Sequence, residues 1–278
     1  MYRILEKKTL APSVIEMQID APLVARSAQA GQFIILRVDA DGERIPLTVA
    51  GQDRARGSVK IIFGAVGATT MRLARKEAGD HIEDFVGPLG RPTVTENIRR
   101  ALVVGGGVGT AIALPVAEKL HGEGKFVHSI VGFRNKDLVI LKEDFAACSD
   151  LFDLVTDDGS AGRKALVTLP LKEALEKGGY DCMIAIGPLP MMKYAVETCR
   201  PYGIRTVVSM NPIMIDGTGM CGCCRLTVGG KMRFACVDGP DFDGYEVDFD
   251  EAIARSGQYR EEEARRREEA CRLFEGVK

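Results

Sequence analysis

Residues 103–115, VVGGGVGTAIALP, decide the fold of the second half of this chain. The apolar run 101–104 predicts a buried strand, the glycines of 105–109 a tight turn, and 110–120 a helix. A glycine turn that opens a helix lets the backbone approach a phosphate, whose charge the helix N-terminus favours. Thr110 stands in the last slot of G-x-G-x-x-G, so the run alone predicts either a dinucleotide site or a tight packing turn.

Strand and helix patterns alternate after this motif. Further strands are expected at 125–133, 152–156, 182–186 and 205–209, and helices at 138–147, 165–177 and 191–200. This alternation predicts parallel βαβ units in a doubly wound sheet.

The first hundred residues have a different pattern. Short apolar or alternating segments lie at 13–19, 32–38, 47–50 and 58–63, with turn residues between them and a helical segment at 69–76. Short strands at such intervals predict a small antiparallel barrel.

The predicted fold is therefore α+β with two domains, an N-terminal antiparallel β-barrel followed by an α/β doubly wound parallel sheet, and a small cysteine-rich subdomain. The expected boundaries are 1–98, 99–212, 213–245 and a helical tail at 246–278. The charge run in this tail is typical of a solvated helix face rather than a binding patch.

Composition excludes several classes of protein. A net charge of −2 over 278 residues gives no basic footprint for nucleic acid or for an anionic membrane. Residues 1–20 contain no apolar signal core, and no segment has the length of a membrane span, so we expect a cytoplasmic protein. Only His81, His121 and His128 are present, and no Ser/His/Asp or Cys/His constellation is apparent, so no acid–base catalytic residue is predicted.

Four of the eight cysteines, Cys221, Cys223, Cys224 and Cys236, fall in one short segment. Plant-type [2Fe–2S] sites have four residues between the first two ligands, two residues before the third, and a distant fourth. Asp216, Cys221, Cys224 and Cys236 reproduce this spacing with a carboxylate in the first slot. Cys223 would break both intervals. The alternatives are a zinc site with mixed ligands and no metal at all.

Other segments have the features of nucleotide sites. Gly187-Pro188 closes a predicted strand, and Asp157 closes another, where it either holds a ribose hydroxyl or caps a turn. Upstream, Arg44-Ile45-Pro46-Leu47-Thr48 combines a cation, a rigid proline and a hydroxyl. Gly67, Thr69 and Thr70 predict either a pyrophosphate seat or a plain helix N-cap.

In this order the segments resemble the ferredoxin–NADP reductase superfamily, in which a flavin barrel precedes a nicotinamide domain. Arg44–Thr48 looks like a divergent copy of its flavin motif, with Leu47 in place of the tyrosine. The resemblance implies an FAD site of Arg44, Pro46, Leu47, Thr48, Ile62, Phe63, Gly67, Thr69 and Thr70. It implies an NAD(H) site of Gly105, Gly106, Gly107, Val108, Gly109, Thr110, Asp157, Gly187 and Pro188.

The cysteine segment narrows the resemblance. Electron-transfer subunits of dihydroorotate dehydrogenase have this layout, but they have a cysteine where this chain has Asp216, and this chain continues well beyond Cys236. Both features look more like the small subunits of flavin-based electron-bifurcating NADH-dependent reduced ferredoxin:NADP⁺ oxidoreductases.

This resemblance implies a heterodimer. The larger partner would be similar to the glutamate synthase small subunit and would carry a second FAD and [4Fe–4S] clusters. The present chain would exchange hydride with NAD(H) and pass single electrons to or from that partner. A subunit serving dihydroorotate dehydrogenase and a non-enzymatic zinc-binding interaction protein are the alternatives. NAD versus NADP stays open, because Arg134 and Arg163 favour a 2′-phosphate and Asp157 opposes one.

Overall fold

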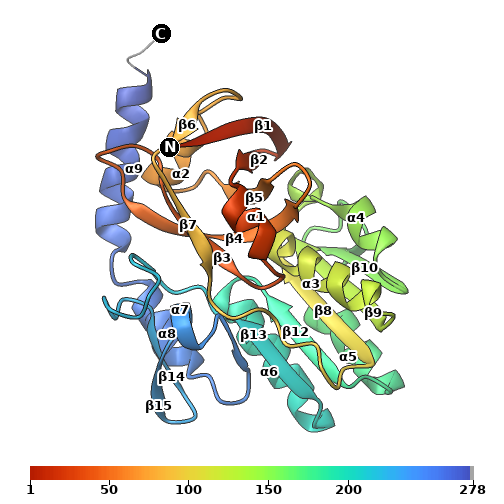
Figure 1. Cartoon of the computed structure of the whole chain (residues 1–278). Coiled ribbons are helices and arrows are strands. Elements are labelled where there is room, and N and C mark those ends of the chain that lie inside the picture. Colours follow the sequence, from red (N-terminus) through yellow and green to blue (C-terminus); the bar gives the residue numbers. More distant parts are fainter. Residues whose placement is uncertain (276–278) are drawn as a thin grey trace.

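The computed structural model describes residues 1–275, with side chains as far as residue 269. The N-terminal part forms an antiparallel near-barrel, which confirms the predicted barrel (Figure 1). Its strand order is β6-β1-β2-β5-β4-β3-β7. Its strands are β1 (Tyr2–Ala11), β2 (Val14–Asp20), β3 (Phe33–Arg37), β4 (Arg44–Asp53), β5 (Ser58–Gly64), β6 (His81–Ile82) and β7 (Asp84–Leu89). Two short helices, α1 (Pro22–Ser27) and α2 (Ala68–Leu73), accompany them.

The core of the near-barrel follows from the alternation of its strands. Met17 and Ile19 of β2 point to the same side as Ile61 and Phe63 of β5, and all four are buried. Residues two apart in a strand share one face, so each strand supplies a row of apolar side chains to the interior. Strand β1 was not predicted, although Ile4 in it is fully buried.

The second part is a sheet with the order β11-β10-β9-β8-β12-β13-β16, parallel except for β16, which runs antiparallel to β13. Its strands are β8 (Arg100–Gly106), β9 (Phe126–Phe133), β10 (Leu151–Thr156), β11 (Arg163–Lys164), β12 (Cys182–Ile186), β13 (Arg205–Ser209) and β16 (Asp241–Asp243). Its helices are α3 (Thr110–Gly122), α4 (Lys142–Ala147), α5 (Thr168–Lys177) and α6 (Leu189–Cys199). The predicted doubly wound sheet is confirmed.

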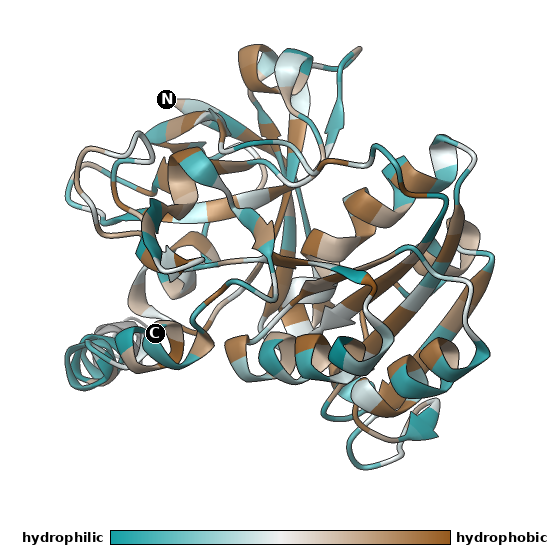
Figure 2. Ribbon diagram, turned by 90° about the horizontal axis from the view of Figure 1, so that it is seen from below, coloured by the Kyte–Doolittle hydropathy of each residue, from teal (hydrophilic) through white to brown (hydrophobic). Residues whose placement is uncertain are grey.

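Both faces of this sheet are covered. Val103 of β8 packs in one apolar cluster with α3 and α4, whereas its neighbour Val104 packs in another with α5 and α6. Adjacent residues of a strand point to opposite faces, so strands covered on both sides are continuous apolar runs rather than alternating ones. The strands of both sheets are mainly hydrophobic, and the helices turn polar residues outward (Figure 2).

The cysteine-rich segment and the tail complete the chain. A hairpin of β14 (Arg225–Val228) and β15 (Lys231–Phe234) leads into α7 (Ala235–Asp238), after which β16 joins the main sheet. The predicted boundaries of this subdomain remain a prediction. The tail is two helices, α8 (Phe249–Ser256) and α9 (Arg260–Glu275), and α9 runs beside α2 and the near-barrel (Figure 1). The end of the predicted tail segment, 276–278, lies outside the described residues.

One predicted helix is wrong in its first half. Residues 138–147 were expected to be helical, but the structure has a 3₁₀ turn at Lys136–Leu138 and begins α4 only at Lys142. Leu141 has a φ of 56°, which an α-helix does not accept. No helix in the described part of the chain is both long and apolar enough to cross a membrane.

Candidate functional site

The strand order of the parallel sheet reverses between β8 and β12. From β8 the sheet continues through β9 and β10 on one side and through β12 and β13 on the other. Open α/β sheets bind ligands in the crevice at the carboxyl ends of the strands where the order reverses. Here these ends are Gly105–Gly109 and Gly187-Pro188, so the structure brings the two predicted nicotinamide segments together.

Glycine is required where these two turns meet. A Cβ at Gly109 would lie 2.6 Å from the Cα of Gly187, and a Cβ at Gly187 would lie 3.2 Å from the amide nitrogen of Gly106. Gly107 has a φ of 54°, and no atom lies within 4 Å of the Cβ position there. The absence of side chains thus allows the two backbones to touch and leaves the tip of the turn open.

Thr110 begins α3 directly beneath the turn. Its side chain is fully buried, and within the described residues its Oγ1 has no hydrogen-bond partner. A buried hydroxyl without a partner is costly, which suits a position that a ligand satisfies. Asp157 lies at the same carboxyl edge but two strands away, after β10, and its amide donates to the Phe133 carbonyl oxygen at 3.0 Å.

The predicted flavin residues of β4 occupy two faces. Arg44, Pro46 and Thr48 share one face by the two-residue period, while Leu47 packs against the core of the near-barrel. Phe63 also lies in that core, whereas Ile62 belongs to the apolar cluster under α3.

The predicted pyrophosphate segment is a helix cap in this structure. Thr70 Oγ1 accepts from the amides of Gly67, at 3.0 Å, and Val66, at 3.1 Å. Thr69 Oγ1 donates to the Glu43 carboxylate at 3.2 Å. Both hydroxyls have protein partners, but the N-cap of α2 is Gly67 and not a threonine, because Thr69 and Thr70 lie within the first turn of the helix.

Asp216 organises the cysteine loop. Its Oδ2 accepts from the Cys221 amide at 2.6 Å, and its Oδ1 accepts from the amide of Thr218 and from the Thr218 hydroxyl, the latter at 3.0 Å. The Thr218 amide, with further help from Cys221, lowers the pKa of Asp216 to about 2. The carboxylate is therefore ionised, and the half-buried Asp216 precedes the cysteines.

Two cysteine sulfurs meet behind this loop. Cys224 and Cys236 are buried, and the Cys224 Sγ donates to the Cys236 Sγ at 3.2 Å. Burial, followed by the neighbouring Cys224, raises the pKa of Cys236 to about 12. A buried pair of this kind becomes thiolate when a metal supplies the compensating charge, which fits an iron–sulfur or zinc ligand set.

The remaining predicted ligand is at the surface. Cys221 is exposed, and Cys223 Sγ lies 4.0 Å from the Cys221 carbonyl oxygen. Among the side chains that the structure describes, no three Cys, His, Asp or Glu residues converge as a metal-holding group. The ligand set of Asp216, Cys221, Cys224 and Cys236 therefore remains a prediction.

The cysteine loop rests on the near-barrel, which sequence reasoning did not foresee. Arg44 Nε donates to the Ile215 carbonyl oxygen at 2.9 Å, and Arg91 Nε donates to the Val237 carbonyl oxygen at 3.0 Å. A Cβ at Gly217, whose φ is 81°, would lie 2.6 Å from Leu89 of β7. The loop thus lies against the strand that carries the predicted flavin residues.

Sequence reasoning also missed Met191. A Cβ at Gly106 would lie 2.2 Å from its sulfur and one at Gly187 would lie 2.8 Å from its Cε, so its thioether fills the space beside both glycine turns. Nothing in the sequence distinguishes Met191 from an ordinary helix residue.

Comparison of the sequence with known proteins identifies related proteins. Residues 211–248 match the model of the iron–sulfur cluster binding domain of dihydroorotate dehydrogenase B. The chain is 46% identical over 263 residues to a homologue of the dihydroorotate dehydrogenase B (NAD(+)) electron transfer subunit from Thermotoga maritima, covering 95% of this chain and 93% of the relative. It is 32% identical over 248 residues to that electron transfer subunit from Streptococcus pneumoniae, covering 86% and 94%.

Among solved structures, one chain from the structure of the NADH-dependent reduced ferredoxin-NADP oxidoreductase, described for flavin-based electron bifurcation, matches with a TM-score of 0.92. It is 42% identical, and the match covers 99% of this chain and 98% of the other. A cytochrome P450 reductase from Amycolatopsis shares the fold alone, at 21% identity and a TM-score of 0.62 over 73% of this chain and 66% of that one.

Proposed function

The chain belongs to the family of the dihydroorotate dehydrogenase B electron transfer subunits and their homologues, and from this membership we propose that it carries electrons between NAD(H) and a larger partner subunit. In this proposal FAD binds against β4 and α2, NAD(H) binds at the β8/β12 crevice, and a [2Fe–2S] cluster is held by Asp216, Cys221, Cys224 and Cys236.

The observation that supports this proposal most is the meeting of the cysteine loop with the flavin strand. Arg44 of β4 contacts Ile215, the residue before Asp216, at 2.9 Å. A one-electron carrier and a hydride acceptor have to lie close together if electrons are to pass between them, and this contact joins their two predicted sites directly.

The residues of the chain supply position rather than acid–base chemistry. FAD, when bound, exchanges a hydride with NAD(H) and releases electrons singly. The close approach of Gly109 to Gly187 and the open space at Gly107 support a nicotinamide site at this crevice, with the Met191 thioether beside it. At the base of this crevice the buried Thr110 hydroxyl has no hydrogen-bond partner among the described residues.

We propose that the partner is the larger subunit of an electron-bifurcating NADH-dependent ferredoxin:NADP⁺ oxidoreductase, similar to the glutamate synthase small subunit. The match to a chain of such an enzyme covers 99% of this sequence, tail included. The match to the pneumococcal electron transfer subunit covers 86% of this sequence. A dihydroorotate dehydrogenase catalytic subunit is the second candidate, which the family model over 211–248 favours.

An absorption spectrum of the anaerobically purified chain tests the cofactors. Flavin bands with a broad, red-shifted iron–sulfur absorption are expected, together with bleaching of the flavin bands on addition of NADH. A colourless protein that contains zinc would refute the proposal. Purification of the native complex decides the partner, because a co-purifying dihydroorotate dehydrogenase catalytic subunit would replace the bifurcating partner.

A further inference from the structure

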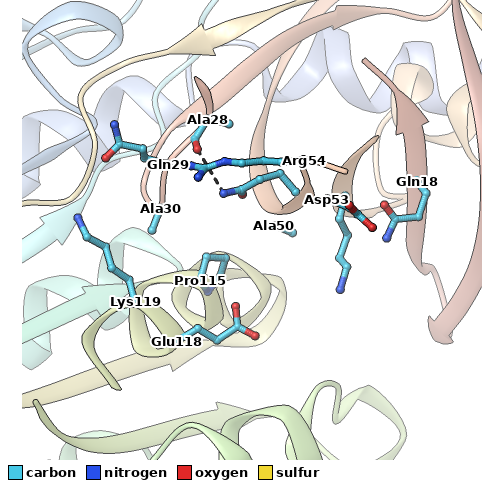
Figure 3. A pocket seen from close by; sticks show the side chains of 13 residues that line it. Gln18, Ala28, Gln29, Ala30, Ala50, Asp53, Arg54, Pro115, Glu118 and Lys119 are labelled. Atoms are coloured by element: carbon cyan, nitrogen blue, oxygen red, sulfur yellow. Dashed lines mark hydrogen bonds between the residues drawn. The ribbon is translucent and has the colours of Figure 1, made fainter. Parts of the chain in front are cut away.

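A cavity of about 690 Å³ lies between the near-barrel and α3, apart from the predicted cofactor sites (Figure 3). Its volume is within the range of about 300–1,000 Å³ that is usual for small-molecule sites. It is lined by Ala50–Asp53 at the end of β4 and by Pro115, Glu118 and Lys119 of α3. Along the strand and the helix, Thr48 and Thr110 are about 7–17 Å from the lining residues of the same two elements.

Three cations from three different elements line this cavity. Arg54 comes from the turn after β4, Lys60 from β5 and Lys119 from α3. Figure 3 shows Arg54 extending across one side of the cavity, with Lys119 at another side and Glu118 opposite Arg54. Gln18, Gln29 and Gln52 add amide groups to the wall.

These cations form no salt bridge among the described residues, although the charge of Lys60 acts on Glu118 and that of Lys119 acts on Glu123 and Asp241. Within the described residues, the side chains of Arg54 and Lys60 form neither a salt bridge nor a hydrogen bond, and Lys119 Nζ donates only to the Thr93 carbonyl oxygen, at 2.9 Å. Elsewhere on the near-barrel, by contrast, Arg37 pairs with Asp84 at 2.7 Å and Arg56 pairs with Glu6 at 2.5 Å.

Two acids, Asp53 and Glu118, stand against the three cations, so the lining keeps one positive charge in excess when both acids are ionised. Asp53 accepts a hydrogen bond from the Arg56 amide at 2.9 Å and forms no salt bridge in the described part of the chain. Burial raises the pKa of Glu118, an effect that the charge of Lys60 opposes. The cavity thus presents an excess of donors and one carboxyl that a ligand hydroxyl can meet.

We propose that this interdomain cavity binds a small polyvalent anion that carries carboxylate or phosphate groups and a hydroxyl. Arg54, Lys60 and Lys119 contact the charged groups, and Glu118 accepts from the hydroxyl. Charge-assisted hydrogen bonds from several cations are the means by which proteins hold such anions. This binding site is independent of the flavin and cluster assignments.

One consequence rests on the proposed function. The cavity bridges β4, whose other end carries the predicted flavin residues, and α3, whose first residue lies under the predicted nicotinamide site. A ligand that contacts both elements favours one arrangement of the two domains, so its binding changes the rate at which NADH reduces the flavin.

Isothermal titration of the purified chain at low ionic strength tests the site, with citrate as the carboxylate probe and glycerol 2-phosphate as the phosphate probe. Low salt is needed because screening weakens contacts to exposed cations. We expect one probe to bind, and its identity to show which anion the site prefers. The double variant R54Q/K60Q should weaken that binding at least about tenfold, or about 1.4 kcal/mol.

The matched control is Lys172→Gln on α5, where Lys172 pairs with Glu176 at 3.8 Å; it should bind as the unmodified chain does. The proposal is overturned if neither probe binds or if R54Q/K60Q binds normally. Probe binding without any change in the rate of NADH-dependent ferricyanide reduction would refute the coupling and leave the site intact.

Discussion

Individual residues with unusual surroundings give the sharpest tests. Asp216 is ionised and tied to the loop by the amides of Thr218 and Cys221, so it shapes the loop in addition to its proposed role as a ligand. Gly109 and Gly187 are fixed by a close backbone approach in which no Cβ fits. Substitutions at these positions should therefore change cluster retention or flavin reduction in a specific way.

Replacement of Asp216 separates its two roles. Asp216→Cys should retain the cluster and shift its reduction potential, because a thiolate is a softer ligand than a carboxylate. Asp216→Ala should reduce cluster retention by about 10–100-fold, the effect typical even of indirect metal contacts. Iron content, visible absorption and potentiometry measure both. An unchanged spectrum and potential in Asp216→Ala would show that Asp216 is not a ligand.

Substitution of Gly109 tests the crevice. In Gly109→Ala the new Cβ would lie 2.6 Å from the Gly187 Cα, so the two turns must separate, at about 1–3 kcal/mol of stability. We expect slow flavin reduction by NADH with normal flavin and iron content. Gly122→Ala, at the end of α3 with no atom within 4 Å of its Cβ position, is the control and should behave as the unmodified chain. Unimpaired NADH reduction in Gly109→Ala would argue against a nicotinamide site here.

At the scale of elements, the contact between β4 and the cysteine loop connects two parts that are far apart in the sequence. Arg44 and Ile215 are 171 residues apart. The loop has little secondary structure of its own, and β7 and β3 supply the surface on which Gly217 sits. The near-barrel therefore supports the cysteine loop as well as the predicted flavin.

Arg44→Met tests this support, since methionine replaces the apolar stem of the arginine and removes its guanidinium donors. Loss of the hydrogen bond to Ile215 should destabilise the loop by about 1 kcal/mol, so the iron–sulfur absorption should decay faster in air than in the unmodified chain. Flavin affinity should fall as well if Arg44 binds FAD. Arg56→Met, which removes the pair with Glu6 on the same near-barrel, is the control. Equal decay in the two variants would refute the supporting role.

At the scale of the molecule, the segment between the two sheets is fastened to the last strand. Thr93 Oγ1 donates to Asp241 Oδ2 at 2.6 Å, and Arg91 donates through its amide to the Gly239 carbonyl oxygen at 2.7 Å. Asp241 Oδ1 is buried, with no partner among the described residues, and burial raises the pKa of this carboxyl. The segment at Arg91–Thr93 is thereby joined to the parallel sheet through the buried carboxyl of Asp241, directly after the cysteine segment.

Asp241 should make stability depend on pH. Below the unfolded-state pKa of about 3.9 the carboxyl is protonated in both states, so its burial does not lower the stability of the fold. As the pH rises from there toward the raised folded-state pKa, the unfolded chain loses its proton more readily than the folded chain, and the stability falls. Asp241→Asn keeps an acceptor for Thr93 and removes the buried charge. We expect it to equal the unmodified chain near pH 4 and to be more stable at pH 7, by about 1.4 kcal/mol for each unit of the shift. Urea unfolding at both values measures this; a variant less stable at pH 7 would contradict it.

Much of the fold was predictable because it depends on local patterns. The glycine run 103–115 and the apolar segments after it fix a parallel sheet, since strands buried on both faces need continuous apolar sequence. Strand β1 was missed because charged residues interrupt its alternation, and α4 begins late because Leu141 takes a left-handed conformation that no local pattern announces.

The sequence by itself determined that a β-rich part precedes a βαβ part, and it determined the spacing of Asp216 and the three cysteines, because each depends on residues near one another in the chain. Only the tertiary structure decided that Arg44 holds the cysteine loop, that Asp241 fastens the linker, and that Arg54, Lys60 and Lys119 line one cavity. These contacts join segments distant in sequence through surface and interdomain packing, and no periodicity encodes which side chains will meet there.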